Sequence, residues 1–152
     1  MPQELLHCES EEEYRICYEN NYCRTPILTF DGIRIFFKKE CFKHAFFEST
    51  NRDGRKNLFS QVRASRMNWI KKTLLSPDAS LFQGWNKKSK TYSSNRRVAV
   101  VVDNFVVVIR LSLNRKGILK GEFITCYEAN NSIEKIRESP RWDKSECLKE
   151  LK

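Results

Sequence analysis

The chain lacks the features by which a membrane-spanning or exported protein is recognised in its sequence. No apolar run approaches the length needed to cross a bilayer, and the first residues show no charged start followed by an apolar stretch. We therefore expect a cytoplasmic protein without a membrane partner. In that reducing compartment the six cysteines are expected to be free thiols rather than a disulfide framework.

Several common catalytic signatures are missing as well. The chain has no glycine-rich phosphate loop and no nucleotide-binding fingerprint, which argues against a kinase or an NTPase. Acidic residues between 21 and 130 are scattered, whereas a two-metal nuclease needs clustered carboxylates. We therefore expect neither a cofactor nor a catalytic metal ion.

The N-terminal thiols leave one metal site to be considered. His7, Cys8, Cys17 and Cys23 are a valid ligand set for zinc. Their spacing contains neither a CxxC pair nor an HxxxH pair, and the gaps between the cysteines are long. We favour an acidic extension with incidental thiols and expect no stoichiometric zinc, with a zinc site as the alternative.

The chain does have an excess of positive charge, and this charge is unevenly distributed. The net charge is +9, yet the first twenty residues carry six glutamates against one arginine. Basic residues concentrate in two blocks, at 52–72 and 87–97. Such blocks are typical of nucleic-acid binding, although a lysine-rich surface that only aids solubility has the same composition.

Hydrophobic periodicity predicts an α+β fold. The patterns indicate a hairpin turning at Asp31-Gly32, two helices, a short strand, a meander of three strands and a short C-terminal helix. The hairpin covers 27–37, the two helices cover 38–49 and 57–75, and the short strand covers 80–84. The meander consists of 98–102, 104–113 and 118–129, and the C-terminal helix covers 132–138. Length argues for one domain. We expect an acidic N-terminal extension at 1–26, the folded domain at 27–130, and a C-terminal helix and tail at 131–152.

Two arginines stand out on the second predicted helix. Arg63 and Arg66 fall on the same half of the helix as its apolar residues. A guanidinium on a buried face is costly unless it meets an anion, which is either the carboxylate of a structural salt bridge or a phosphate ligand. Two such arginines one turn apart suit a shared phosphate, because each planar guanidinium group can donate two hydrogen bonds to phosphate oxygens.

His44, Thr125 and Tyr127 complete the candidate site. His44 is the only histidine in the body of the chain, and its imidazole can transfer a proton near neutral pH. A packed or capping role is the alternative for a lone histidine. Strict alternation along 118–129 places Phe123, Thr125 and Tyr127 on one face of the strand, so that a hydroxyl and a phenol point the same way.

Five short motifs together resemble a known group of ribonucleases. They are FKHAFFE at 42–48, RMNWIKKTLLSP at 66–77, Tyr92, FVVVIR at 105–110 and GEFITCY at 121–127. Over residues 28–130 the chain resembles the phage-type branch of the barnase–EndoU–colicin E5/D–RelE superfamily. The resemblance implies two helices packed on a four-stranded antiparallel sheet and metal-independent RNA cleavage, usually by toxins or mobile-element effectors.

The functional expectation is therefore a metal-independent endoribonuclease acting through the 2′-hydroxyl of its substrate. Catalytic roles fall to His44, Arg66, Thr125 and Tyr127, and substrate binding is assigned to Arg63, Arg55, Lys71, Tyr92, Arg97 and Arg110. The expected partners are RNA, whether tRNA, rRNA or mRNA, and a cognate inhibitor protein if one exists. The alternative is a non-catalytic RNA-binding or protein-interaction module of a mobile element. A binding module would not need His44 to face Thr125 and the arginines across one cleft.

Overall fold

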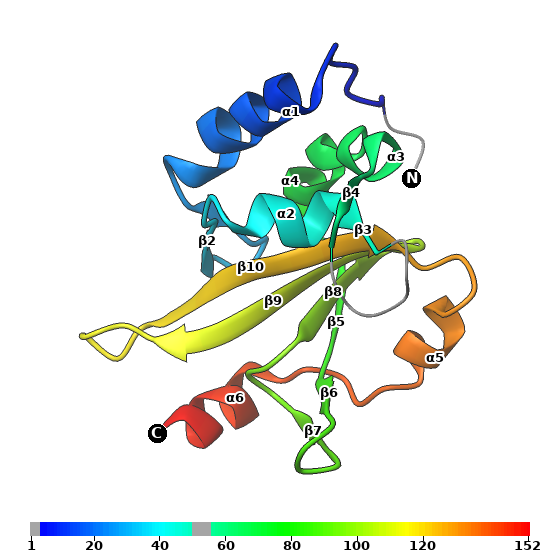
Figure 1. Ribbon diagram of the computed structural model, residues 1–152. Helices are drawn as coiled ribbons and strands as arrows, with labels where there is room; N and C mark the ends of the chain where they lie inside the picture. The colour runs from blue at the N-terminus through cyan, green and yellow to red at the C-terminus, as the bar shows by residue number, and fades with distance from the viewer. Residues whose placement is uncertain (1–3, 50–55) are drawn as a thin grey trace.

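The computed structural model describes residues 4–49 and 56–152, and its centre is a mixed six-stranded sheet (Figure 1). The strand order is β1-β2-β10-β9-β8-β5. These strands are β1 Ile27–Leu28, β2 Arg34–Phe36, β5 Ser80–Phe82, β8 Val98–Val102, β9 Phe105–Leu113 and β10 Leu119–Glu128. Two small hairpin sheets are separate from it, formed by β3 Phe47–Glu48 with β4 Leu58–Phe59 and by β6 Gly84–Asn86 with β7 Thr91–Ser93.

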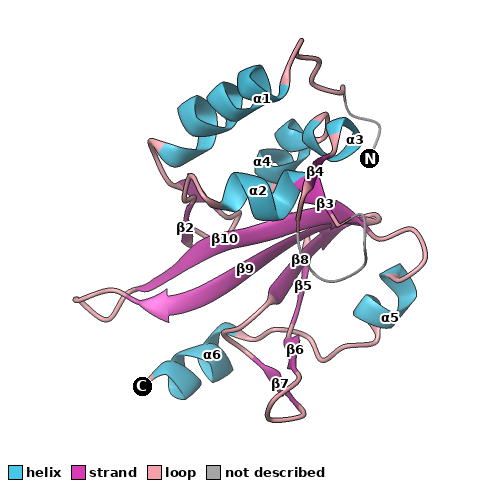
Figure 2. Cartoon of the chain, in the orientation of Figure 1, coloured by secondary structure: helices cyan, strands magenta, loops and turns pink. Residues whose placement is uncertain are grey.

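Helices lie on both sides of this sheet (Figure 2). They are α1 Glu11–Tyr18 with the π-helical turn η1 Glu19–Cys23, then α2 Cys41–Phe46, α3 Gln61–Ala64, α4 Met67–Leu75, α5 Ile133–Arg137 and α6 Lys144–Leu151. The first four α-helices cover one face and enclose the main core, whereas α5 packs its two isoleucines against a smaller core on the other face.

The expected architecture of two helices on a four-stranded antiparallel sheet is wrong. The class is α+β, but the described residues contain six α-helices and a main sheet of six strands in mixed orientation. The difference arises at the edges. Strand β2 of the N-terminal hairpin pairs in parallel with β10, and β5 pairs with β8 on the opposite edge. Parallel pairing of distant segments leaves no local sequence signal, so hydrophobic patterning could not predict it.

The helix predicted over 57–75 is also interrupted. Its first residues form β4, and α3 begins after Ser60, whose Oγ accepts a hydrogen bond from the Arg63 amide at 3.2 Å. A turn at Ser65 and Arg66 then separates α3 from α4, with Arg66 at φ −98° and ψ 12°. Apolar spacing continues across this break, which is why periodicity alone predicted one helix.

The N-terminal segment contributes directly to the main core. Tyr14, Tyr18 and Tyr22 are buried by α2, α4 and the sheet. Each phenol donates a hydrogen bond to a backbone carbonyl, at 3.0 Å for Tyr14, 2.8 Å for Tyr18 and 2.7 Å for Tyr22. Three large aromatic side chains with satisfied hydroxyls anchor this segment to the rest of the fold.

A β-bulge in β10 changes which side chains share a face. The register with β9 shifts between Phe123 and Thr125, so Ile124 is the extra residue. Phe123 and Cys126 therefore both enter the main core, while Ile124 and Tyr127 pack against the smaller core on the opposite face. The expected alignment of Phe123, Thr125 and Tyr127 does not occur, because a bulge reverses the alternation beyond it.

Candidate functional site

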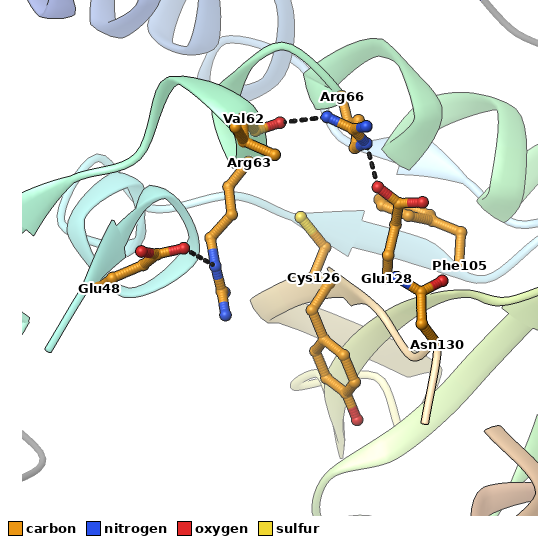
Figure 3. Close-up of a pocket in the computed structure, with 9 residues that line it drawn as sticks. Glu48, Val62, Arg63, Arg66, Phe105, Cys126, Glu128 and Asn130 are labelled. Carbon is orange, nitrogen blue, oxygen red and sulfur yellow. Dashed lines mark hydrogen bonds and ion pairs between the residues drawn. The ribbon is translucent and has the colours of Figure 1, made fainter. Parts of the chain in front are cut away.

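The C-terminal end of β10 forms one wall of a pocket of about 230 Å³ (Figure 3). The facing wall comes from α3, from the junction between α3 and α4, and from the end of β3. Residues that are distant in sequence therefore meet here. The described residues that line the pocket are Glu48, Val62, Arg63, Arg66, Phe105, Cys126, Tyr127, Glu128 and Asn130.

Arg66 is held at the pocket wall by an ion pair with Glu128 (Figure 3). Its Nη1 also donates hydrogen bonds to the Val62 carbonyl at 2.6 Å and to the Ser65 hydroxyl at 3.2 Å. The guanidinium carbon lies 5.2 Å from the centroid of the Trp69 ring, within range of a cation–π interaction. These contacts fix the side chain in one orientation, and the carboxylate supplies the anion that its half-buried position requires.

Arg63 makes a looser ion pair at the other side of the pocket. Its Nε lies 3.5 Å from Oε1 of Glu48, and the two side chains are 30% and 50% exposed. Figure 3 shows the Arg63 side chain extending across the pocket toward Glu48. Because this pair is more exposed than the Arg66 pair, it costs less to open.

Tyr127 also lines this pocket, although its phenol ring packs against the smaller core on the opposite face of the sheet. Burial raises the pKa of this phenol above its usual value, and the positive charges of Arg97 and Arg63 only partly oppose that shift. Tyr127 is therefore a neutral hydrogen-bond donor at physiological pH. Cys126 beside it is deeply buried, and burial raises its pKa to about 12, so its thiol is not a nucleophile there.

His44 and Thr125 meet at a different point from the one expected. The Thr125 hydroxyl donates a hydrogen bond of 3.3 Å to the backbone carbonyl of His44, across the free edge of β10 beyond its pairing with β2. His44 is exposed in the last turn of α2 and is not among the described residues that line the pocket. The backbone of His44, and not its imidazole, therefore contacts Thr125. Arg63 and Arg66 pair instead with Glu48 and Glu128.

The remaining expected substrate-binding residues lie in different parts of the molecule. Arg63 lines the pocket, and Lys71 is exposed on α4. Arg97 and Arg110 line a separate groove beside the β6–β7 hairpin, and Tyr92 belongs to that hairpin. Arg55 lies outside the described residues.

Two carboxylates of the pocket were not predicted from the sequence. Glu48 closes the motif at 42–48 and Glu128 ends β10, and both belong to the acidic residues that look scattered along the chain. A signal for Glu48 was present in the sequence, because it belongs to a motif that already held a candidate histidine. Glu128 gave no such signal, since only the bulge turns it toward Arg66.

No group of three or more potential ligand side chains is placed to bind a metal ion in the part of the chain that the structure describes. Two of the N-terminal thiols nevertheless approach each other, with Cys8 Sγ 3.9 Å from Cys17 Sγ. Burial, together with the neighbouring Cys17, raises the pKa of Cys8 to about 11. A thiol of that pKa is mostly protonated at neutral pH, which weakens it as a zinc ligand.

The resemblance to ribonucleases depends on the short sequence motifs alone, because three comparisons with known proteins add no support. No protein-family model, no curated protein and no solved structure matches this chain. None of the helices in the described ranges has the length and apolar character needed to span a bilayer.

Proposed function

We propose that the protein is a metal-independent endoribonuclease that acts as a toxin or mobile-element effector, and that the pocket at the end of β10 is its active site. The observation that carries this proposal is the grouping of complementary reactive side chains in about 230 Å³. They are the carboxylate of Glu48 and the guanidinium groups of Arg63 and Arg66. A carboxylate can transfer a proton, and guanidinium groups stabilise the charge that develops on a phosphate.

We assign these groups the following roles in the proposed reaction. Glu48 takes the proton of the ribose 2′-hydroxyl, and the 2′-oxygen attacks the adjacent phosphorus while the bond to the 5′-oxygen breaks. A water molecule donates a proton to the departing 5′-oxygen, and Glu48 then returns its proton to solvent. The products are a 2′,3′-cyclic phosphate and a 5′-hydroxyl. Arg63, released from Glu48 by the substrate, neutralises the phosphate.

Arg66 has a positioning role in this scheme. Its guanidinium is occupied by Glu128, by the Val62 carbonyl and by the Ser65 hydroxyl, so it braces the pocket wall. His44 remains the alternative acid or base, because Thr125 ties the end of its helix to β10 beside the pocket. In that case the His44 imidazole would transfer the proton from the edge of the pocket.

The decisive experiment is cleavage of single-stranded RNA, tRNA and rRNA by purified protein in excess chelator. We expect cleavage that persists in chelator, leaves cyclic phosphate and 5′-hydroxyl ends, and stops when 2′-deoxyribose is placed at the scissile position. Cleavage of the deoxy substrate, or products with 5′-phosphate ends, would rule out this mechanism.

A second function, RNA binding without catalysis, is favoured by one specific observation. Both pocket arginines already have carboxylate partners, and the described pocket lining omits His44. A binding module needs no convergence of acid, base and phosphate ligand. If wild-type protein binds RNA tightly but cleaves none of the substrates above, the binding function replaces the enzymatic one.

A further inference from the structure

A second and larger basic surface lies away from the pocket, on the side of the sheet that carries the β6–β7 hairpin. It is a groove of about 750 Å³, and none of the described residues that line it is acidic. They are Trp85, Asn86, Lys87, Lys88, Arg96, Arg97, Arg110 and Ile124. We propose that this groove holds single-stranded RNA, with Trp85 and Tyr92 stacking on its bases and the surrounding cations following its phosphates.

The cations of this groove are available to a ligand. Within residues 4–49 and 56–152, Lys87, Lys88 and Arg96 form no ion pair with any carboxylate. Arg110 is the exception, with Nη2 at 2.7 Å from Oε2 of Glu122. A concentration of positive charge without internal partners is the footprint of a polyanion site, and here it lines a concave surface.

The aromatic side chains of the hairpin add a second kind of interaction. Trp85 and Tyr92 are cross-strand partners with ring centroids 5.1 Å apart, and they are 48% and 43% exposed. An isolated pair of large rings on a two-stranded hairpin buries little apolar area, so packing alone does not explain it. Rings beside cations fit unpaired bases, because stacking needs an open base face that a duplex does not offer.

The fold packs the β6–β7 hairpin directly against the backbone of Arg96 and Arg97. A Cβ at Gly84 would lie 2.2 Å from the Arg96 carbonyl oxygen and 2.3 Å from that of Arg97, so only glycine allows this backbone approach. Arg97 itself has a positive φ of 51°, and the Arg96 amide donates to the Ser93 hydroxyl at 3.1 Å. The groove is therefore largely formed before a ligand arrives.

Shared lining residues connect the groove with the proposed active site. Trp85 lines both the groove and an adjoining pocket, and Tyr127 lines that adjoining pocket and the Glu48 pocket. Burial raises the pKa of the Tyr127 phenol, and the charge of Arg97 in the groove is close enough to oppose part of that rise. A strand cleaved at Glu48 can thus continue past Tyr127 onto the hairpin. The inference rests on the proposed function for this direction, while binding in the groove can be measured without cleavage.

The test uses a fluorescent 12-nucleotide RNA with 2′-O-methyl riboses, which cannot be cleaved by 2′-hydroxyl attack. Trp85→Ala should weaken its binding about 5- to 100-fold, the loss expected for one stacked base, and Trp85→Phe should restore most of it. Lys87→Ala with Lys88→Ala should lower the slope of log affinity against log salt by roughly 0.7 for each phosphate that is no longer neutralised. Phe36→Ala, which removes an exposed ring on β2, is the matched control and should bind normally.

Each outcome decides a separate claim. Tight, Trp85-dependent binding by a protein that cleaves no RNA supports the groove and refutes the nuclease. Normal binding by the Trp85→Ala protein, equal affinity for a blunt duplex, or preference for vesicles containing phosphatidylserine would each overturn the groove proposal, whether or not RNA is cleaved. Thermal melts of all variants exclude unfolding, since the substituted side chains are largely exposed.

Discussion

Arg66 and Glu128 form an ion pair that fastens the junction of α3 and α4 to the last residue of β10. The two side chains are 22% and 25% exposed, so each would lose much of its solvation without the other. Only the Ile124 bulge brings Glu128 to this face of the strand. The ion pair therefore joins the bulged end of β10 to the turn between α3 and α4.

Removing one member of this pair should destabilise the protein. Arg66→Ala leaves Glu128 without its partner and also removes the hydrogen bonds to Val62 and Ser65, so we expect a loss of about 1–3 kcal/mol in the free energy of unfolding. Denaturant titration measures it. Arg63→Ala, at the more exposed pair, should cost less than about 1 kcal/mol. Equal losses for the two variants would contradict this difference.

Glu48→Gln tests the proposed general base directly. The amide cannot accept the 2′-hydroxyl proton, so the cleavage rate should fall about 10²–10⁴-fold while RNA affinity is kept or rises. Single-turnover kinetics separate the two effects. Glu40→Gln, an exposed carboxylate at the start of α2, is the matched control and should retain wild-type rates. Full activity of the Glu48→Gln protein would remove this residue from the mechanism.

His44 and Thr125 offer the competing assignment. If the imidazole moves a proton in the transition state, His44→Ala should lower the rate about 10²–10⁴-fold. If Glu48 is the base, the loss should be far smaller, because the Thr125 bond to the His44 backbone survives this substitution. Thr125→Val removes that bond, and we expect a modest rate loss in either case. Comparing the cleavage rates of the His44→Ala and Glu48→Gln proteins identifies the general base.

Cys126 should make the protein sensitive to alkali. Burial raises the pKa of its thiol from 9.0 to about 12, although the charge of Arg63 works in the opposite direction. The folded state therefore keeps the proton while the unfolded state releases it, and the stabilisation present below pH 9 is lost as the pH rises toward 12. Unfolding titrations at about pH 8 and pH 10 should show a drop of about 1 kcal/mol that Cys126→Ala lacks. Parallel curves for both proteins would refute the assignment.

Gly84→Ala tests the geometry of the groove. Because the new methyl group would meet the Arg96 and Arg97 carbonyl oxygens, the hairpin must shift, at a cost of about 1–3 kcal/mol. RNA affinity should fall although every cation and ring of the groove is kept. Ser89→Ala, at the tip of the same hairpin, should leave affinity unchanged. Unaltered binding by the Gly84→Ala protein would mean that this packing does not set the groove.

The sequence predicted those parts of the fold that depend on neighbouring residues. The three long strands and the short C-terminal helix follow from β-branched runs and helical spacing, and they are present. Chain geometry that depends on distant contacts was missed: the parallel pairing of β2 with β10, and the bulge at Ile124. For the candidate site, the sequence singled out the two arginines that line the pocket, but Glu128 could not be found because its orientation depends on that bulge.

The pairing of β2 with β10 also affects when the pocket can assemble. Arg34 in β2 faces Lys120 in β10, and the pocket combines residues from 48 to 130. Contacts so distant in sequence form late, after the loop between them has closed. A ribosome must therefore release nearly the whole of this segment before β10 can dock, and a nascent chain has no assembled pocket until then. Under the proposed ribonuclease function, this delay keeps the pocket unassembled while the chain is still beside the ribosome and its message.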